Sequence, residues 1–423
     1  MKNYFKTHFF KKTSHVITTR SALIWMYLAN EPLVALYTLL LFILRKDLHA
    51  NAFQISLFAT LRPVMSVLSF YWSSNLLRQR EKLLSNLMGA WVLARIPFLC
   101  LPFINNVWYL IFSAGVYQLF SRAAIPSMIE ILKLNMQKEP REKLFSQLYI
   151  ISFIESIILG IVFGRLLDMY EGTWIPLFFV ASILSLTSIL IQMRIPLPLL
   201  KQDTNIPPIT TNRLLQPIKD SIHLMRLRPD FSRFQWGFMI GGFGLMFITP
   251  AVTIYYADIL NLTHNHLAIA RYIWMGIGVV ISTFLWKYGL NTFSLNRVTA
   301  SIILGFSFFP ITLLLAKQNL IWINIAFFIY GIAQAGSHLT WNLSGTFFSK
   351  NEDSSKFSRV NILMVGVRGM IAPVLGGFFC NFFTPPFILI IGMIICFFGA
   401  ILMLHNPVKI TSPLPSSNSI SSS

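Results

Sequence analysis

Apolar stretches of about 20 residues recur along this chain from residue 21 to residue 404. A helix of that length spans the ~30 Å hydrocarbon core of a bilayer. Of the 423 residues, 55% are hydrophobic and only 12% are charged, whereas a soluble chain of this length would normally divide into domains with charged surfaces. Membrane β-barrels show short alternating segments instead. The sequence therefore predicts an all-α integral membrane protein that crosses the bilayer many times.

Hydropathy predicts twelve transmembrane helices. They are expected at 21–44, 53–74, 83–104, 107–129, 145–167, 173–193, 234–257, 267–286, 298–316, 319–346, 357–380 and 384–404. Most of the 34 lysine and arginine residues then fall on the side of the N-terminus, and only Arg45, Lys46, Arg165 and Lys317 fall opposite. Cytoplasmic loops carry such an excess of basic residues. We therefore expect both termini in the cytoplasm, and we attribute the net charge of +19 to topology rather than to nucleic-acid binding.

A basic, proline-rich stretch at 195–230 is the longest interruption of the apolar pattern. It predicts a cytoplasmic linker, within which 214–227 favours a surface amphipathic helix. The predicted organisation is a cytoplasmic N-terminal tail (1–20), a six-helix bundle (21–194), the linker (195–230), a second six-helix bundle (231–405) and a Ser-rich cytoplasmic tail (406–423).

The two predicted bundles resemble each other in sequence. Phe145 and Ser146 align with Phe357 and Ser358, and Gly164 aligns with Gly376 at the same offset. Repeated helical halves around a central site are the architecture of secondary transporters.

Two six-helix halves, a long basic central loop and a basic loop after the second span resemble the major facilitator superfamily over about residues 20–405. The resemblance implies a central cavity lined by spans 1, 2, 4, 5, 7, 8, 10 and 11. The family's loop motif, G-x-x-x-D-R-x-G-R-R, is degraded here, because an asparagine replaces the aspartate and the glycines are missing. By this resemblance, the candidate gating-loop residues are Asn75, Arg78, Arg80, Asn291 and Arg297.

Seven ionisable residues fall in the middle of predicted spans: Glu31, Arg62, Arg95, Arg122, Glu155, Arg271 and Arg368. A charge at the bilayer centre costs about 2.5–3.5 kcal/mol on insertion scales. We therefore expect most of them to face the protein interior or a water-filled cavity. The family resemblance puts all but Arg95 on cavity-lining helices, so Arg95 is expected to be structural, and Arg271 to snorkel at the outer face.

Glu31 and Glu155 are the candidate proton carriers. Glu31 precedes Pro32, which bends the helix and frees a backbone carbonyl; the alternative role for Glu31 is a structural ion pair with an arginine. Glu155 and Arg368 lie one residue apart in the alignment of the halves, so we expect them to face each other across the cavity as a gate or substrate clamp. The alternative is that each is paired within its own half.

Three of the arginines, Arg62, Arg122 and Arg368, are the candidate contacts for an anion. Arg62 has the alternative of pairing with Glu31, and Arg122 of a structural or proton-relay role. Span ten adds candidate selectivity groups, namely Gln334, His338, Trp341 and Asn342. Three of these four are spaced by four residues and share a helix face, and the alternative for this face is hydrogen bonding between helices.

Five arginines against two glutamates, with no lysine in mid-span, favour an organic anion as the solute, because the planar guanidinium suits carboxylates and phosphates. We expect a secondary active transporter, a symporter or antiporter that alternates access and is coupled to protons. The sequence contains no phosphate-binding loop motif, so we do not expect ATP to drive transport directly. No residue pattern indicates an enzyme, a cofactor or a metal site. The alternatives are a proton-coupled multidrug exporter, and a membrane-embedded enzyme or lipid scramblase. We expect a monomer in the plasma (inner) membrane.

Overall fold

A computed structural model describes the chain over residues 2–73, 80–197, 211–349 and 353–405. Within these ranges every regular element is a helix and none is a strand, which confirms the all-α class. The first bundle comprises α1 (Lys2–Lys46), α2 (Ala52–Ser73), η1 (Arg80–Lys82), α3 (Leu83–Leu99), α4 (Val107–Asn135), α5 (Lys138–Met169) and α6 (Trp174–Gln192). The second comprises α8 (Pro229–Phe247), α9 (Thr249–Ile254), η2 (Tyr255–Ile259), α10 (His264–Ala268), η3 (Ile269–Trp274), α11 (Met275–Thr292), α12 (Leu295–Leu315), α13 (Ile321–Ser349), α14 (Ser354–Phe379) and α15 (Pro385–His405).

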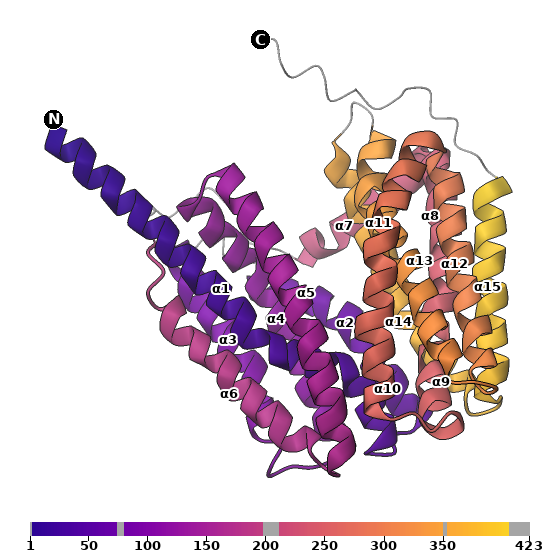
Figure 1. Ribbon diagram of the computed structural model, residues 1–423. Coiled ribbons are helices and arrows are strands. Elements are labelled where there is room, and N and C mark those ends of the chain that lie inside the picture. Colours follow the sequence, from indigo (N-terminus) through magenta and orange to yellow (C-terminus); the bar gives the residue numbers. More distant parts are fainter. Residues whose placement is uncertain (1, 74–79, 198–210, 350–352, 406–423) are drawn as a thin grey trace.

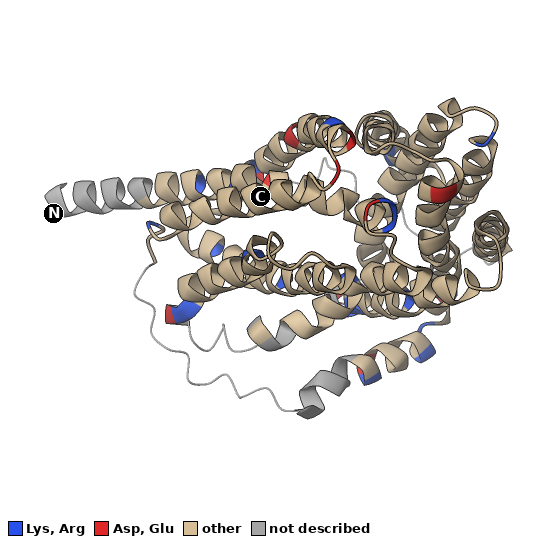
Figure 2. Ribbon diagram, turned by 90° about the horizontal axis from the view of Figure 1, so that it is seen from below, with Lys and Arg blue, Asp and Glu red and all other residues tan. Residues whose placement is uncertain are grey.

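The helices are long and apolar, as is required of helices that are surrounded by lipid. In the described residues, nine helical rods are long and apolar enough to cross a membrane. The remaining expected spans coincide with α3, a shorter apolar helix of 17 residues, and with α4 and α13, which have 29 residues each and carry more polar side chains. Viewed along the bundles, few positions on the ribbons are charged (Figure 2).

The two bundles stand side by side and are joined through α7 (Thr211–Leu227), the helix expected within the linker (Figure 1). They converge at the end where α9 and α10 lie and separate toward the end that carries the N-terminus. We call the converging end, formed by the loop after α1 and by residues 255–264, the closed end. The predicted tail at 1–20 is not set off from the first span, because α1 continues without a break from Lys2. The predicted tail at 406–423 lies outside the described residues.

Each bundle has its own apolar core, and the two cores meet at the closed end. Phe42 of α1 packs into the core of the second bundle, whereas Ala268 and Tyr272 pack into the core of the first. Glycines permit this approach: a Cβ on Gly160 of α5 would lie 2.2 Å from the Tyr272 ring, and one on Gly377 of α14 would lie 1.6 Å from the Ser56 hydroxyl. The bundles therefore touch closely at one end of the molecule.

Candidate functional site

The two intramembrane carboxylates lie on neighbouring helices of the first bundle. Glu31 of α1 is 6% exposed and accepts a hydrogen bond from the Ser156 hydroxyl of α5. Glu155, the residue before Ser156, is half-buried, and one of its oxygens has no hydrogen-bond partner among the described residues. Glu155 also feels the charge of Glu31. The alternative ion pair between Glu31 and Arg62 is not among the ion pairs of the described residues. The two carboxylates therefore lie on neighbouring helices without an ion-pair partner among those residues.

Two of the predicted anion contacts, Arg62 and Arg122, lie on the neighbouring helices α2 and α4. Arg62 is exposed and Arg122 is half-buried, and each lies near the middle of its helix. Arg62 is close enough for its charge to act on Arg122 and on His338 of α13 in the second bundle. Among the described residues, neither arginine forms an ion pair. Two like charges that have no counterion at this depth are a candidate site for an anion.

The candidate selectivity groups on α13 lie in two different environments. Gln334 and His338 hydrogen-bond to each other, with 2.9 Å between the amide nitrogen and the ring Nε2. His338 and Asn342 are exposed. The indole of Trp341 instead packs against Phe238, with ring centroids 6.0 Å apart, at the edge of the second bundle's core. His338 and Asn342 are therefore accessible, while Trp341 is held by packing.

Arg368 of α14 is held within the second bundle. It is 8% exposed, donates to the Phe238 carbonyl over 3.0 Å, and lies over the Phe238 ring at 5.4 Å from the centroid. It occupies the space left by Gly242, where a Cβ would lie 1.8 Å from its guanidinium. No ion pair with Glu155 is found among the described residues. The observed contacts thus correspond to the alternative in which Arg368 is held within its own half.

Arg95 is fixed inside the first bundle. It is 1% exposed and donates to Ser185 (3.0 Å), to the Trp91 carbonyl (3.1 Å) and to Asn30 (2.7 Å). Its guanidinium also stacks on the Trp91 ring at 3.6 Å. These contacts join α1, α3 and α6, as expected for a structural arginine. Arg271 is half-buried in the π-helical segment η3.

The candidate gating-loop residues are described only in part. Asn75 and Arg78 lie outside the described residues, as does the side chain of Arg80, which begins η1. Asn291 is exposed near the end of α11. Arg297 is exposed in the first turn of α12, where its backbone N–H donates to the Ser294 hydroxyl.

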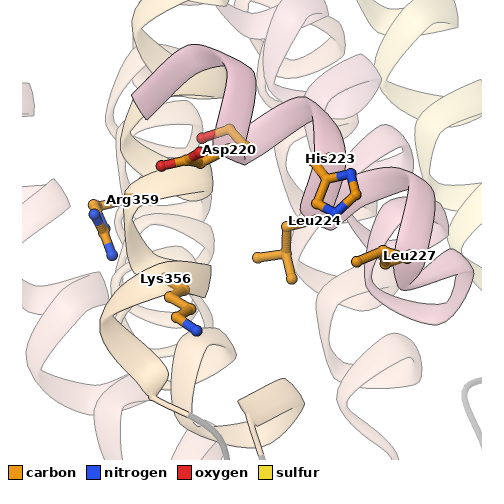
Figure 3. A pocket seen from close by; sticks show the side chains of 7 residues that line it. Asp220, His223, Leu224, Leu227, Lys356 and Arg359 are labelled. Carbon is orange, nitrogen blue, oxygen red and sulfur yellow. The ribbon is translucent and has the colours of Figure 1, made fainter. Parts of the chain in front are cut away.

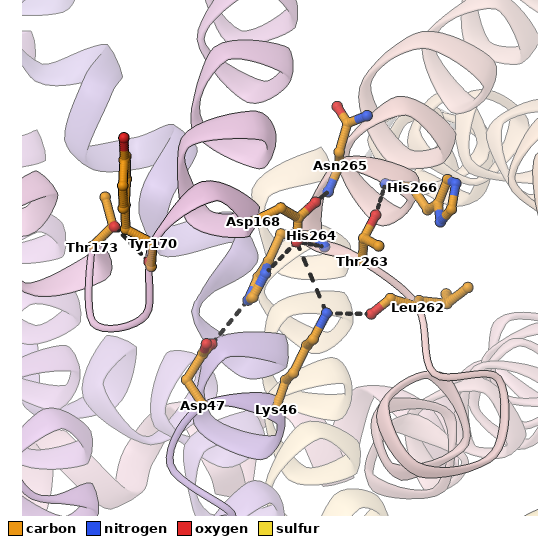
Figure 4. Close-up of polar contacts among 10 residues, drawn as sticks. All are labelled: Lys46, Asp47, Asp168, Tyr170, Thr173, Leu262, Thr263, His264, Asn265 and His266. Atoms are coloured by element: carbon orange, nitrogen blue, oxygen red, sulfur yellow. Dashed lines mark hydrogen bonds and ion pairs between the residues drawn. The ribbon is translucent and has the colours of Figure 1, made fainter.

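A charged cluster at the closed end was missed by the sequence analysis. It consists of Arg45, Lys46, Asp47, Asp168, Asp258 and His264 (Figure 4 shows its central part). The guanidinium of Arg45 pairs with Asp258, with 2.9 Å from Nε to Oδ1, and Lys46 donates to the Leu262 carbonyl over 2.6 Å. These contacts link the end of α1 to the second bundle. The available signal was the pair Arg45 and Lys46, which are basic residues on the side predicted to be poor in them.

A surface cavity of about 360 Å³ lies between α7 and the start of α14 (Figure 3). Its lining includes His223, Leu224 and Leu227 of the linker helix and Lys356 and Arg359 of α14. None of the intramembrane charges lines this cavity. It is therefore separate from the candidate solute site.

Two bundles of apolar helices that carry ionisable side chains in mid-helix are typical of membrane transport proteins. The family model "Major Facilitator Superfamily" matches residues 23–358, and the chain belongs to this family. The predicted family resemblance is confirmed. The chain is therefore an integral, multi-pass membrane transporter that acts on a small-molecule solute.

Solved structures of transporters share this fold. A point mutant of the nucleoside transporter NupG is 12% identical, with a TM-score of 0.73 over 93% of this chain and 99% of its own. A point mutant of the peptide transporter POT is 14% identical, with a TM-score of 0.69 over 92% and 93%. A bacterial homolog of the human lysosomal transporter Spinster is 11% identical, with a TM-score of 0.61 over 95% and 99%. No curated protein matches the sequence of this chain.

Proposed function

We propose that this protein carries a small organic anion across the plasma (inner) membrane by alternating access, coupled to protons. The observation that carries the proposal is that Arg62 and Arg122 lie near the middle of the neighbouring helices α2 and α4, and neither forms an ion pair among the described residues. A carboxylate or phosphate on the solute would supply a counterion. Arginine suits this role because its planar fork binds such groups through two hydrogen bonds.

The second bundle contributes neutral groups to the proposed site. His338 lies within range of the Arg62 charge and is hydrogen-bonded to Gln334, and Asn342 lies one turn further along the same helix. These groups suit a role in selecting the uncharged part of the solute. Arg368 and Trp341 both contact Phe238 in the core of the second bundle, so their proposed role is to hold that bundle's side of the site in place.

Proton coupling is assigned to Glu31 and Glu155. A carboxyl that changes its protonation can offset the charge of a bound anion, and the two carboxylates share the α1–α5 contact of the bundle that supplies the arginines. With both termini in the cytoplasm, the separated end of the bundles faces the cytoplasm, and the closed end faces outward. The monomer suffices for this cycle, because both halves of the site belong to one chain.

The test is a binding and uptake comparison with the purified, reconstituted protein. A panel of organic phosphates and carboxylates is screened by thermal shift, since a ligand of the native state raises the melting temperature. In the Arg62→Gln variant, the affinity for the anion that binds is expected to fall about 10- to 100-fold, because a hydrogen bond to a charged group contributes about 1.5–3 kcal/mol. The matched control is Arg233→Gln, at an exposed position near the start of α8.

Three outcomes would contradict the proposal. If lipophilic drugs but no anions bind and are moved, the protein is a multidrug exporter. If Arg62→Gln transports the anion as the Arg233→Gln control does, the arginines do not form the site. If lipids cross the membrane at the same rate with and without an uncoupler, the protein is a scramblase.

A further inference from the structure

At the closed end, one imidazole joins the two bundles through both of its ring nitrogens. His264 begins α10 and is 2% exposed. Its Nδ1 lies 3.0 Å from an oxygen of Asp168 at the end of α5, and its Nε2 lies 2.9 Å from an oxygen of Asp47 just after α1 (Figure 4). The edge of the ring also packs on Phe42, with centroids 5.2 Å apart. The ring is therefore enclosed by the first bundle.

The two contacts of the His264 ring require an additional proton. An ionised carboxylate only accepts hydrogen bonds, whereas a neutral imidazole has one donor and one acceptor nitrogen. A neutral ring between two ionised carboxylates would place a lone pair against an oxygen at about 3 Å, which is repulsive. Both contacts are satisfied only when the group of three holds one more proton, on the ring or on a carboxyl.

The partners of Asp168 keep that carboxyl ionised. Its two oxygens accept the backbone N–H groups of His264 and Asn265, each over 2.8 Å, and hydrogen bonds of this kind stabilise the charged form. Lys46 lies 3.9 Å away. The additional proton therefore resides on the ring or between the ring and Asp47.

The other charges of the cluster also favour one additional proton on the group of His264, Asp47 and Asp168. Arg45 and Lys46 supply two positive charges, against the carboxylates Asp47, Asp168 and Asp258. A protonated ring brings the cluster to neutrality, and a neutral ring leaves one negative charge in excess. The remaining charged side chains nearby in sequence, Arg165 and Glu171, are exposed.

We propose that His264, Asp47 and Asp168 form a proton-binding site that exists only while the closed end is shut. This inference rests on the alternating access proposed above. Opening carries His264 away from both carboxylates and exposes the ring to water, where histidine is mostly neutral at pH 7. The N–H bond then breaks, the proton passes to water, and no other covalent bond changes. Acid on that side therefore stabilises the closed form.

The coupling between protonation and closure can be measured through the distance between two spin labels. Spin labels at Phe103→Cys and Phe382→Cys, two exposed loop positions at the closed end, report on separation of the bundles in full-length protein in lipid nanodiscs, with Cys100, Cys380 and Cys396 replaced by serine. If closing binds one proton more than opening, the ratio of open to closed molecules rises up to about tenfold per pH unit.

Two variants assign the proton to the site. In His264→Gln, the slope of the logarithm of the open-to-closed ratio against pH is expected to fall by about one, since glutamine does not titrate. Asp47→Asn is expected to do the same, because an amide can either donate to or accept from a neutral ring. Size-exclusion profiles check the fold of each variant. The matched control is His266→Gln, an exposed histidine in the same helix, which should keep the wild-type slope.

The outcomes separate this inference from the function on which it rests. A wild-type slope in His264→Gln overturns the inference, and so do two distance populations whose ratio ignores pH. A single distance at every pH, with and without solute, overturns alternating access itself and the proton site with it.

Discussion

The Tyr272 hydroxyl donates a hydrogen bond to the Ala35 carbonyl over 2.9 Å, and so joins η3 of the second bundle to the middle of α1. The carbonyl is within four residues of Glu31, and the Tyr272 ring packs beside Gly160, five residues after Glu155. Tyr272 therefore contacts α1 and α5, the same two helices that carry Glu31 and Glu155.

The first prediction concerns this hydrogen bond. Tyr272→Phe keeps the packed ring and removes the hydroxyl that donates to the Ala35 carbonyl, so this hydrogen bond between η3 and α1 is lost. The closed form is expected to lose about 1 kcal/mol, or about a fivefold change in the closed-to-open ratio. The label pair at the closed end measures this ratio. Tyr288→Phe, at a 69% exposed position, should leave it unchanged, and an unchanged ratio in Tyr272→Phe would show that the hydrogen bond does not stabilise closure.

A second prediction uses the glycine on the other side of the ring. A Cβ at Gly160 would lie 2.2 Å from Tyr272, a separation that forces the bundles or the ring to move. Such overpacking costs about 1–3 kcal/mol, so Gly160→Ala should populate the open form about tenfold more and slow uptake accordingly. Gly366→Ala on α14 is the control, because nothing lies within 4 Å of its added Cβ. Equal uptake in both variants would argue that closure does not limit transport.

Arg95 gives a prediction about stability alone. Arg95→Met removes the donor that Ser185, Asn30 and the Trp91 carbonyl share, and a hydrogen bond from a charged group contributes about 1.5–3 kcal/mol. We expect a clearly lower melting temperature but an unchanged KM for the solute. The exposed Lys143→Met should change neither, since surface substitutions are usually within about 0.5 kcal/mol. A raised KM in Arg95→Met would instead place Arg95 at the site.

Hydropathy and repeat patterns were enough to predict the fold, because lipid imposes apolar helices of a set length. The family resemblance, which places the span of Arg95 outside the cavity-lining set, led us to expect a structural role for Arg95. Hydropathy and repeat patterns did not reveal that Arg368 binds the Phe238 carbonyl. The alignment of the halves defines how deep a residue lies, but not which neighbour leaves room for its side chain, and here Gly242 provides that room.

The closed-end cluster escaped prediction for a different reason. Asp47, Asp168 and His264 lie at helix ends, where polar residues are ordinary and hydropathy carries no information. Their residues are also far apart in the sequence, and no local spacing links them. Only the close approach of α5 to α10, permitted by Gly164, whose added Cβ would lie 2.9 Å from Ala268, brings them together.

The last prediction separates coupling from solute binding. Glu31→Gln keeps the size of the side chain and can still accept the hydrogen bond from Ser156, but it cannot release a proton. In proteoliposomes, uptake driven by a pH gradient is expected to fall at least about tenfold, while exchange of labelled for unlabelled solute without a gradient continues. Glu142→Gln, at an exposed position of α5, should behave as wild type in both assays. If gradient-driven uptake survives in Glu31→Gln, the proton is carried elsewhere; Glu155→Gln and His264→Gln in the same two assays then show at which group.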